Sequence, residues 1–143
     1  MRVIFVCHGN ICRSPMAEAI FKSLTDNVEV LSAGLYALEG ESASSNAIQV
    51  CGYNDLELRN HESKNFYDLD IRDDDLVLTL TFDIRDNIKQ RYPDLEVYTV
   101  KEYAGEKEFL DIKDPYGEDV EVYEICFCEI KEYLENIVKM HDF

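Results

Sequence analysis

Basic residues are scarce in this sequence. Lys and Arg account for only 14 of its 143 residues, whereas Asp and Glu account for 30, and the formal net charge at pH 7 is −16. A surface with this balance repels the phosphates of nucleic acids and the headgroups of anionic membranes. We therefore expect a protein that binds neither nucleic acid nor a membrane.

Long apolar runs are missing as well. The run at 2–6 is followed at once by polar residues, so it is too short for a signal peptide or a membrane-spanning helix. This favours a cytoplasmic location. No repeat, low-complexity tract or compositional shift marks a linker, and 46% of the residues are hydrophobic. We therefore expect a single domain that covers residues 1–143.

The cysteines are few and odd in number. Five cysteines leave at least one thiol free, and a chain with this apolar content needs no disulfide framework. Cys126 and Cys128 lie in a predicted helix, where side chains at this spacing point about 200° apart. A metal site that both thiols share is therefore not expected.

Apolar residues alternate between the spacings of strands and helices along the chain. The sequence predicts strands at 2–6, 28–32, 75–79 and 95–100, and helices at 14–26, 44–51, 81–92 and 120–140. Strands that are apolar along most of their length are typical of a parallel sheet with helices on both faces. We therefore predict a doubly wound α/β fold. Ser14 is expected near the N-cap of the first helix, and the charged run at 72–75 is expected in a solvated loop or helix end.

The loop between the first strand and the first helix, CHGNICRS, has the features of an anion site. Cys7 lies at the carboxyl end of a parallel strand, where open α/β sheets bind ligands. Free amides and the dipole at a helix N-terminus attract an anion, and Gly9 allows the backbone to curl around it. The same field favours a thiolate at Cys7, and Arg13 offers paired donors to phosphoryl oxygens. The C-x5-R-S spacing therefore predicts a catalytic phosphate-binding loop, with Cys7 as the nucleophile.

Phosphate transfer to a cysteine also requires an acid for the leaving group and a base for the attacking water. The segment Asp114-Pro115-Tyr116-Gly117 offers a carboxylate next to a proline that fixes the backbone. Its local sequence alone would indicate an ordinary Asp-Pro turn. The cysteine loop makes Asp114 the candidate for both roles.

The segments VCHGNICRSPMAEAIF and DPYG closely resemble the signature loop and the acid loop of the low-molecular-weight protein tyrosine phosphatases, and the resemblance extends over essentially the whole chain. It implies hydrolysis of phosphotyrosine through a phosphocysteine intermediate on Cys7, with Arg13 as phosphate ligand and Asp114 as general acid. It also implies a four-stranded parallel sheet, no metal and no organic cofactor. The substrate-binding residues that it implies are His8, Gly9, Asn10, Ile11, Cys12, Ser14 and Tyr116.

The resemblance also implies supporting residues and a form of regulation. Asn10 and Ser14 would support the loop and the thiolate, while Ser32 and His61 match partners that hold Asn10 in place. Cys12 matches a cysteine that forms a protective disulfide with the nucleophile in family members, so reversible oxidation is expected. The implied partner is a phosphorylated protein or peptide, and we expect a monomer.

The substrate is the main question that the sequence leaves open. Relatives with this fold that remove phosphate from arginine carry threonine at the position of Ile11, whereas tyrosine-directed members carry isoleucine or another apolar residue. Ile11 and Tyr116 suit an aromatic ring, so phosphotyrosine is favoured and an arginine phosphatase is the alternative. This chain also shares with the arginine-directed relatives their length and a TVKEYAG-like segment.

Two further alternatives have weaker support. An arsenate reductase needs additional cysteines to relay a disulfide, and the segment from Leu76 to Arg91 contains none. A phosphate-binding module or a phosphocarrier does not need the positioned acid that Asp114 would supply.

Overall fold

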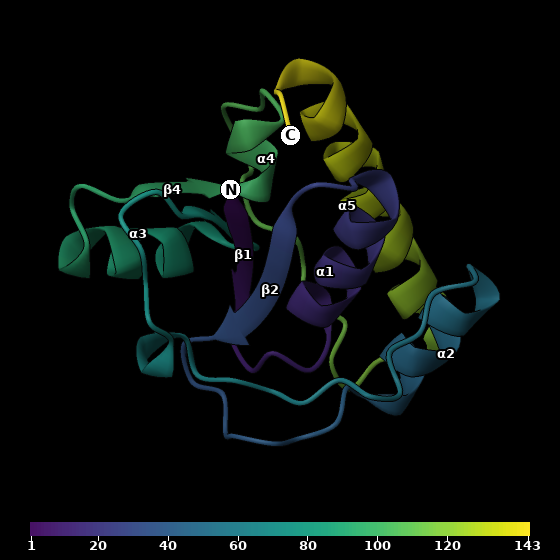
Figure 1. Ribbon diagram of the computed structural model, residues 1–143. Helices are drawn as coiled ribbons and strands as arrows, with labels where there is room; N and C mark the ends of the chain where they lie inside the picture. Colours follow the sequence, from purple (N-terminus) through teal and green to yellow (C-terminus); the bar gives the residue numbers. More distant parts are fainter.

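Four parallel strands form the centre of the protein, which a computed structural model describes over residues 1–143 (Figure 1). They are β1 (Arg2–Cys7), β2 (Glu29–Gly34), β3 (Leu76–Thr79) and β4 (Glu96–Thr99). Their order in the sheet is β2-β1-β3-β4, and every neighbouring pair is parallel. This confirms the predicted four-stranded parallel sheet.

Helices cover both faces of the sheet, as predicted. They are α1 (Arg13–Leu24), α2 (Ser45–Tyr53), α3 (Phe82–Arg91), α4 (Val100–Tyr103) and α5 (Val120–Met140), with a 3-10 turn at Phe66–Asp68. Figure 1 shows α1, α2 and α5 on one side of the sheet and α3 on the other. None of these helices combines the length and the apolar character that a membrane-spanning segment requires.

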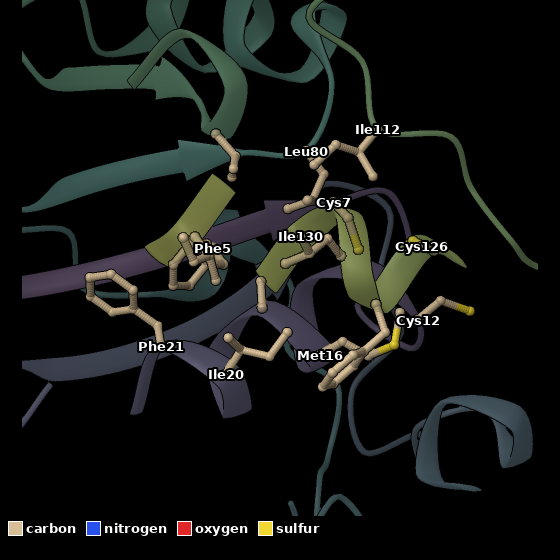
Figure 2. Close-up of a cluster of buried hydrophobic side chains, with 14 of the residues drawn as sticks. Phe5, Cys7, Cys12, Met16, Ile20, Phe21, Leu80, Ile112, Cys126 and Ile130 are labelled. Carbon is tan, nitrogen blue, oxygen red and sulfur yellow. The ribbon is translucent and has the colours of Figure 1, made fainter. Parts of the chain in front are cut away.

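The alternation of side chains along β1 creates a separate core on each face. Phe5 points into the larger core, where its ring and the Phe21 ring from α1 pack edge to face with their centroids 5.4 Å apart (Figure 2). Ile4 and Val6 point the other way and pack with Ile88 of α3. All of these side chains are fully buried, as expected for a strand covered on both faces.

Most predicted elements agree with the structure to within about two residues, but two short elements were missed. One is the 3-10 turn, and the other is α4. The signal for α4 was present in the sequence, because Thr99 and Glu102 form a reciprocal capping box at its start.

The prediction for the charged run at 72–75 was wrong at its last residue. Asp75 is only 1% exposed. Its carboxylate accepts two hydrogen bonds from the Arg2 guanidinium, one from Nε at 2.9 Å and one from a terminal nitrogen at 2.6 Å. The amide of Arg72 also donates to the Asp75 carboxylate. Asp75 therefore ties the start of β1 to the start of β3, while the three residues before it are exposed.

Candidate active site

The chain reverses its direction of winding between β1 and β3. From β1 it moves to β2 on one side of the sheet, and later to β3 on the other side. In open α/β sheets, the crevice at the carboxyl ends of such a strand pair is where ligands bind. Cys7, the last residue of β1, lies at this point.

Helix α1 begins at Arg13, and Cys12 occupies its N-cap without a capping side chain. Ser14 lies near the N-cap as predicted, two residues after it in the first turn, but it is fully buried and does not cap the helix. Its Oγ lies 2.9 Å from the Sγ of Cys7 and accepts a hydrogen bond from the Asn10 side chain at 2.8 Å. The hydroxyl therefore faces the thiol rather than the end of the helix.

Asn10, rather than Gly9, provides the tight curl of the loop. Asn10 adopts a left-handed conformation with φ of 58°, whereas Gly9 does not, and a Cβ on Gly9 would meet only Ile11 at 3.8 Å. A non-glycine residue in this region costs free energy that its surroundings must offset. The amide of Asn10 points to Cys7 Sγ at 3.3 Å, so the curl places a donor at the thiol.

Contacts from distant segments hold Asn10 in this conformation. Its side-chain Nδ2 donates to Ser32 Oγ at 2.9 Å, and its Oδ1 accepts from the amide of Lys64 at 2.9 Å. The Nε2 of His61 lies 2.7 Å from the Asn10 carbonyl oxygen. Burial lowers the pKa of His61, which favours a neutral ring that donates from Nε2. The structure therefore brings Ser32 and His61 to Asn10, and Lys64 is a further contact that sequence reasoning missed.

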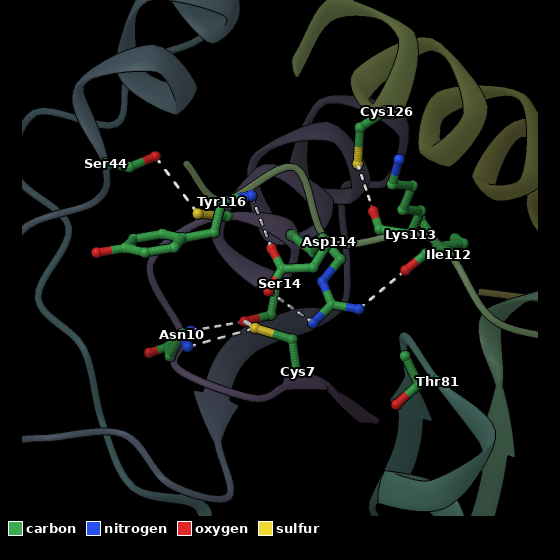
Figure 3. A network of polar contacts seen from close by, with 12 residues as sticks. Cys7, Asn10, Ser14, Ser44, Thr81, Ile112, Lys113, Asp114, Tyr116 and Cys126 are labelled. Carbon is green, nitrogen blue, oxygen red and sulfur yellow. Dashed lines mark hydrogen bonds and ion pairs between the residues drawn. The ribbon is translucent and has the colours of Figure 1, made fainter. Parts of the chain in front are cut away.

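A cavity of about 360 Å³ opens above the Cys7 thiol. Figure 3 shows Cys7, Ser14 and Asn10 close together, with Asp114 and Tyr116 nearby on the segment at 114–117. Asn10 and Ser14 do not line the cavity and are fully buried behind the loop, so they are placed to support the loop rather than to touch a substrate. The lining residues are Cys7, His8, Gly9, Ile11, Cys12, Arg13, Asp114 and Tyr116.

Arg13 is buried beside the thiol and keeps one donor free. Its side chain donates to the carbonyl oxygen of Ile112 at 2.9 Å, which fixes its direction. The residue is only 4% exposed, and its Nε atom is buried without a hydrogen-bond partner. Buried donors are nearly always paired in proteins, so Arg13 keeps hydrogen-bonding capacity that an acceptor such as a phosphoryl oxygen in the cavity could use.

Asp114 shares the cavity with Arg13. Its carboxylate lies 3.5 Å from a terminal nitrogen of Arg13 and is 46% exposed. The other carboxylate oxygen accepts the amide of Tyr116 at 3.1 Å, which holds the side chain in place. A carboxyl group that is both oriented and accessible can exchange a proton with a leaving group or with water.

Aromatic rings flank the mouth of the cavity. Tyr116 is exposed on one loop, and His8 stands against the ring of Tyr36 with their centroids 4.6 Å apart. Tyr36 follows β2, and its amide donates to the His8 carbonyl oxygen at 3.0 Å. Tyr36 was missed by sequence reasoning, because only the register of β1 and β2 brings it next to the loop.

The remaining thiols have different surroundings. Cys12 is buried with its Sγ 3.2 Å from the Tyr123 hydroxyl, and burial raises its pKa. Burial raises the pKa of Cys126 to about 12, whereas Cys128 is exposed on the same helix. No group of three or more His, Cys, Asp or Glu side chains is arranged to hold a metal ion.

Comparison with known proteins places this fold and loop in one family. The family model for low molecular weight phosphotyrosine protein phosphatases matches residues 2–141, and the chain belongs to this family of cysteine-dependent phosphohydrolases. A low molecular weight protein-tyrosine-phosphatase, PtpB of Staphylococcus epidermidis, is 35% identical over 99% of this chain and 100% of its own length. The protein-arginine-phosphatase of Bacillus subtilis is 37% identical over 97% of this chain and 95% of its own.

A solved structure from the family has the same fold. The YwlE arginine phosphatase, a cysteine-to-serine mutant with a phosphorylated active-site serine, superposes with a TM-score of 0.86 at 32% identity. The comparison covers 98% of this chain and 95% of that one. The family thus contains both tyrosine and arginine phosphatases that are similar to this chain over nearly its full length.

Proposed function

We propose that this protein is a protein tyrosine phosphatase in which Cys7 is the nucleophile, Arg13 the phosphate ligand and Asp114 the general acid and base. The observation that carries the proposal is that Arg13, whose buried Nε has no hydrogen-bond partner, lines the same cavity as Cys7 at the start of α1. This combination presents a nucleophile together with donors for an oxyanion.

The proposed reaction has two steps. Cys7 Sγ attacks the phosphorus and forms the S–P bond while the bond to the tyrosyl oxygen breaks, and Asp114 gives its proton to that oxygen. Water then attacks the phosphocysteine, Asp114 takes a proton from the water, and phosphate leaves with the thiolate restored. The phosphorylated active-site serine in the YwlE mutant supports a phosphorylated enzyme in this family.

The shape of the cavity supports phosphotyrosine as the substrate. Ile11 contributes a branched apolar wall, and Tyr116 and His8 offer ring faces at the mouth. An aromatic ring gains from such surfaces, whereas the guanidinium of phosphoarginine needs acceptors for its N–H groups. Phosphoarginine is the second candidate, because the Bacillus subtilis protein-arginine-phosphatase is as similar to this chain as the tyrosine phosphatases are.

Matched peptides that differ only in phosphotyrosine or phosphoarginine test the substrate. Under reducing conditions with a chelator present, we expect phosphate release from the phosphotyrosine peptide to be at least about tenfold faster, and Cys7→Ser to release none. Ile11→Thr should lower the ratio of the phosphotyrosine rate to the phosphoarginine rate. A preference for phosphoarginine would keep the mechanism but overturn the role given to Ile11.

Asp114→Asn tests the role of the acid. We expect kcat to fall by about 10²- to 10⁴-fold while inorganic phosphate still binds, because an amide cannot transfer the proton. A phosphocarrier or a binding module would not lose its function in this variant. Unchanged turnover would show that Asp114 is not the acid.

Cys7 and Cys12 line the same cavity, which supports reversible oxidation of this pair as a means of control. An arsenate reductase stays a more distant alternative, because the additional cysteines near this region lie on the regular helix α5. The cytoplasmic location and the monomeric state stay predictions.

A further inference from the structure

The hydrogen bonds behind the catalytic loop continue beyond Ser32 to a carboxylate. Ser32 lies on β2 and is 1% exposed, and its hydroxyl donates to Glu18 Oε1 on α1 at 2.6 Å. Ser32 Oγ also accepts the Asn10 side chain at 2.9 Å. A continuous series of contacts therefore leads from Glu18 through Ser32, Asn10 and Ser14 to the thiol of Cys7.

The Glu18 carboxylate determines which group donates and which accepts in each hydrogen bond of this series. Glu18 can only accept, so it takes the single proton of the Ser32 hydroxyl and leaves the Ser32 oxygen as an acceptor for Asn10. Asn10 then donates both amide hydrogens, one to Ser32 and one to Ser14. Because Ser14 accepts from Asn10, its own proton is left for the Cys7 sulfur at 2.9 Å or for the Ala33 carbonyl oxygen at 3.3 Å, and a thiolate at Cys7 is both the nearer and the charged acceptor.

We propose that Glu18 is a positioning residue for the phosphatase reaction, which acts through Ser32 on Asn10 and so aims the Ser14 hydroxyl at the sulfur of Cys7. The inference rests on the proposed role of Cys7 as the nucleophile. Glu18 does not line the cavity above the thiol, so its contribution concerns the state of the thiolate and the loop rather than contact with the substrate.

The two oxygens of Glu18 have separate partners. Oε2 pairs with Lys22 at 2.6 Å, one turn further along α1, and this lysine is largely exposed. Such exposed pairs contribute little to stability. Oε1 points inward to Ser32, which an ion pair with Lys22 alone does not require.

Glu18 also borders a second, polar cavity of about 330 Å³ on the surface behind the loop. Glu57 lines this cavity too, and it pairs with Arg59 without contacting the catalytic loop. A shorter side chain at position 18 therefore enlarges a surface cavity rather than opening a hole in the core. Glu57→Ala serves as a matched control, because it removes a carboxylate from the same cavity.

We expect Glu18→Ala to lower kcat by about tenfold, the usual effect of one lost hydrogen bond in a buried network, and to leave KM within about twofold. Glu18→Gln should retain activity within about threefold, because its amide oxygen can still accept the Ser32 proton. Glu57→Ala should match the wild type. A loss in Glu18→Gln as large as in Glu18→Ala would overturn the argument that an acceptor is what matters.

A double-mutant cycle tests the route. If Glu18 acts through Ser32, adding Glu18→Ala to Ser32→Ala lowers kcat by less than about twofold. Losses that multiply would show that Glu18 acts independently of Ser32 and would overturn the proposal. Thermal unfolding of each variant identifies any that have lost their fold.

Alkylation of Cys7 by iodoacetamide provides a readout that needs no phosphatase activity. Between pH 5 and 7, the Glu18→Ala rate should fall about fivefold or more below the wild-type rate, because the thiolate loses an aligned donor. Equal alkylation rates would refute the positioning role. Slower alkylation in a protein that releases no phosphate from any peptide would instead support the positioning role and refute the proposed function.

Discussion

The methyl group added by Gly34→Ala is expected to disable the catalytic loop while leaving the fold in place. Gly34 ends β2 next to the loop, and a Cβ there would lie 2.6 Å from the carbonyl oxygen of His8 and 2.9 Å from the amide nitrogen of Asn10. A third contact, at 3.0 Å, is with the carbonyl carbon of Gly9. All three are backbone atoms, so no side-chain rotation can relieve the overlap.

The size of the effect follows from these distances. Ordinary contacts of a Cβ begin at about 3.4 Å, so the 2.6 Å contact has to lengthen by about 0.8 Å. Overpacking of this kind costs about 1 to 3 kcal/mol in the free energy of unfolding. A displacement of about 1 Å in a catalytic group lowers the rate by about 100-fold, so activity should suffer far more than stability.

Hydrolysis of p-nitrophenyl phosphate and urea-induced unfolding measure the two effects on the same preparation. Gly52→Ala is the matched control, because Gly52 lies in α2 with no atom within 4 Å of an added Cβ. That change should leave kcat unchanged and stabilise the protein by about 0.5 to 1 kcal/mol. If Gly34→Ala retained kcat within about threefold, the loop would be able to absorb the added methyl group without displacing the catalytic groups, and the prediction would be wrong.

Three further predictions concern charge. Asp75→Ala should lower the free energy of unfolding by about 3 kcal/mol in urea titrations, because it leaves the Arg2 charge buried, whereas the double change Arg2→Met and Asp75→Leu should recover most of the loss. Burial holds the pKa of His61 below its usual 6.5, so the unfolded state binds more protons below that pH. Wild-type stability should therefore fall as pH drops below 6.5, and the His61→Gln variant should lack this component of the decrease. With a net charge of −16, the protein should cleave acidic phosphopeptides more slowly than neutral ones at low salt, and added salt should narrow the difference.

The residues that touch the cavity were predictable because most of them are neighbours in sequence. The loop from Cys7 to Arg13 follows directly from a strand, a turn and a helix start, and local patterns reveal each of these. Asp114 could be predicted only by asking which acid the chemistry of the loop requires. Its position beside Arg13 depends on the path of the chain after α4, which no local pattern fixes.

The residues that hold the loop were harder to predict, because their contacts span long sequence separations. Lys64 reaches Asn10 through a backbone amide, which any residue type would supply, so the sequence carries no signal for it. Glu18 lies on the polar side of an amphipathic helix pattern, and the sequence indicates only that it can pair with Lys22 four residues later. Asp75 was misjudged for a related reason, since its partner Arg2 is far away in sequence.

Asn10 shows why the supports matter as much as the groups that face the cavity. Its left-handed backbone is unfavourable by itself, yet its amide, its carbonyl oxygen and its side chain all have partners from β1, α1, β2 or the segment at 61–64. These partners fix the curl of the loop through contacts within the protein. A loop fixed in this way meets the developing charge with donors already in place, so little reorganisation is needed during the reaction. The contacts that set the rate should therefore include residues, such as Ser32, His61 and Glu18, that no substrate reaches.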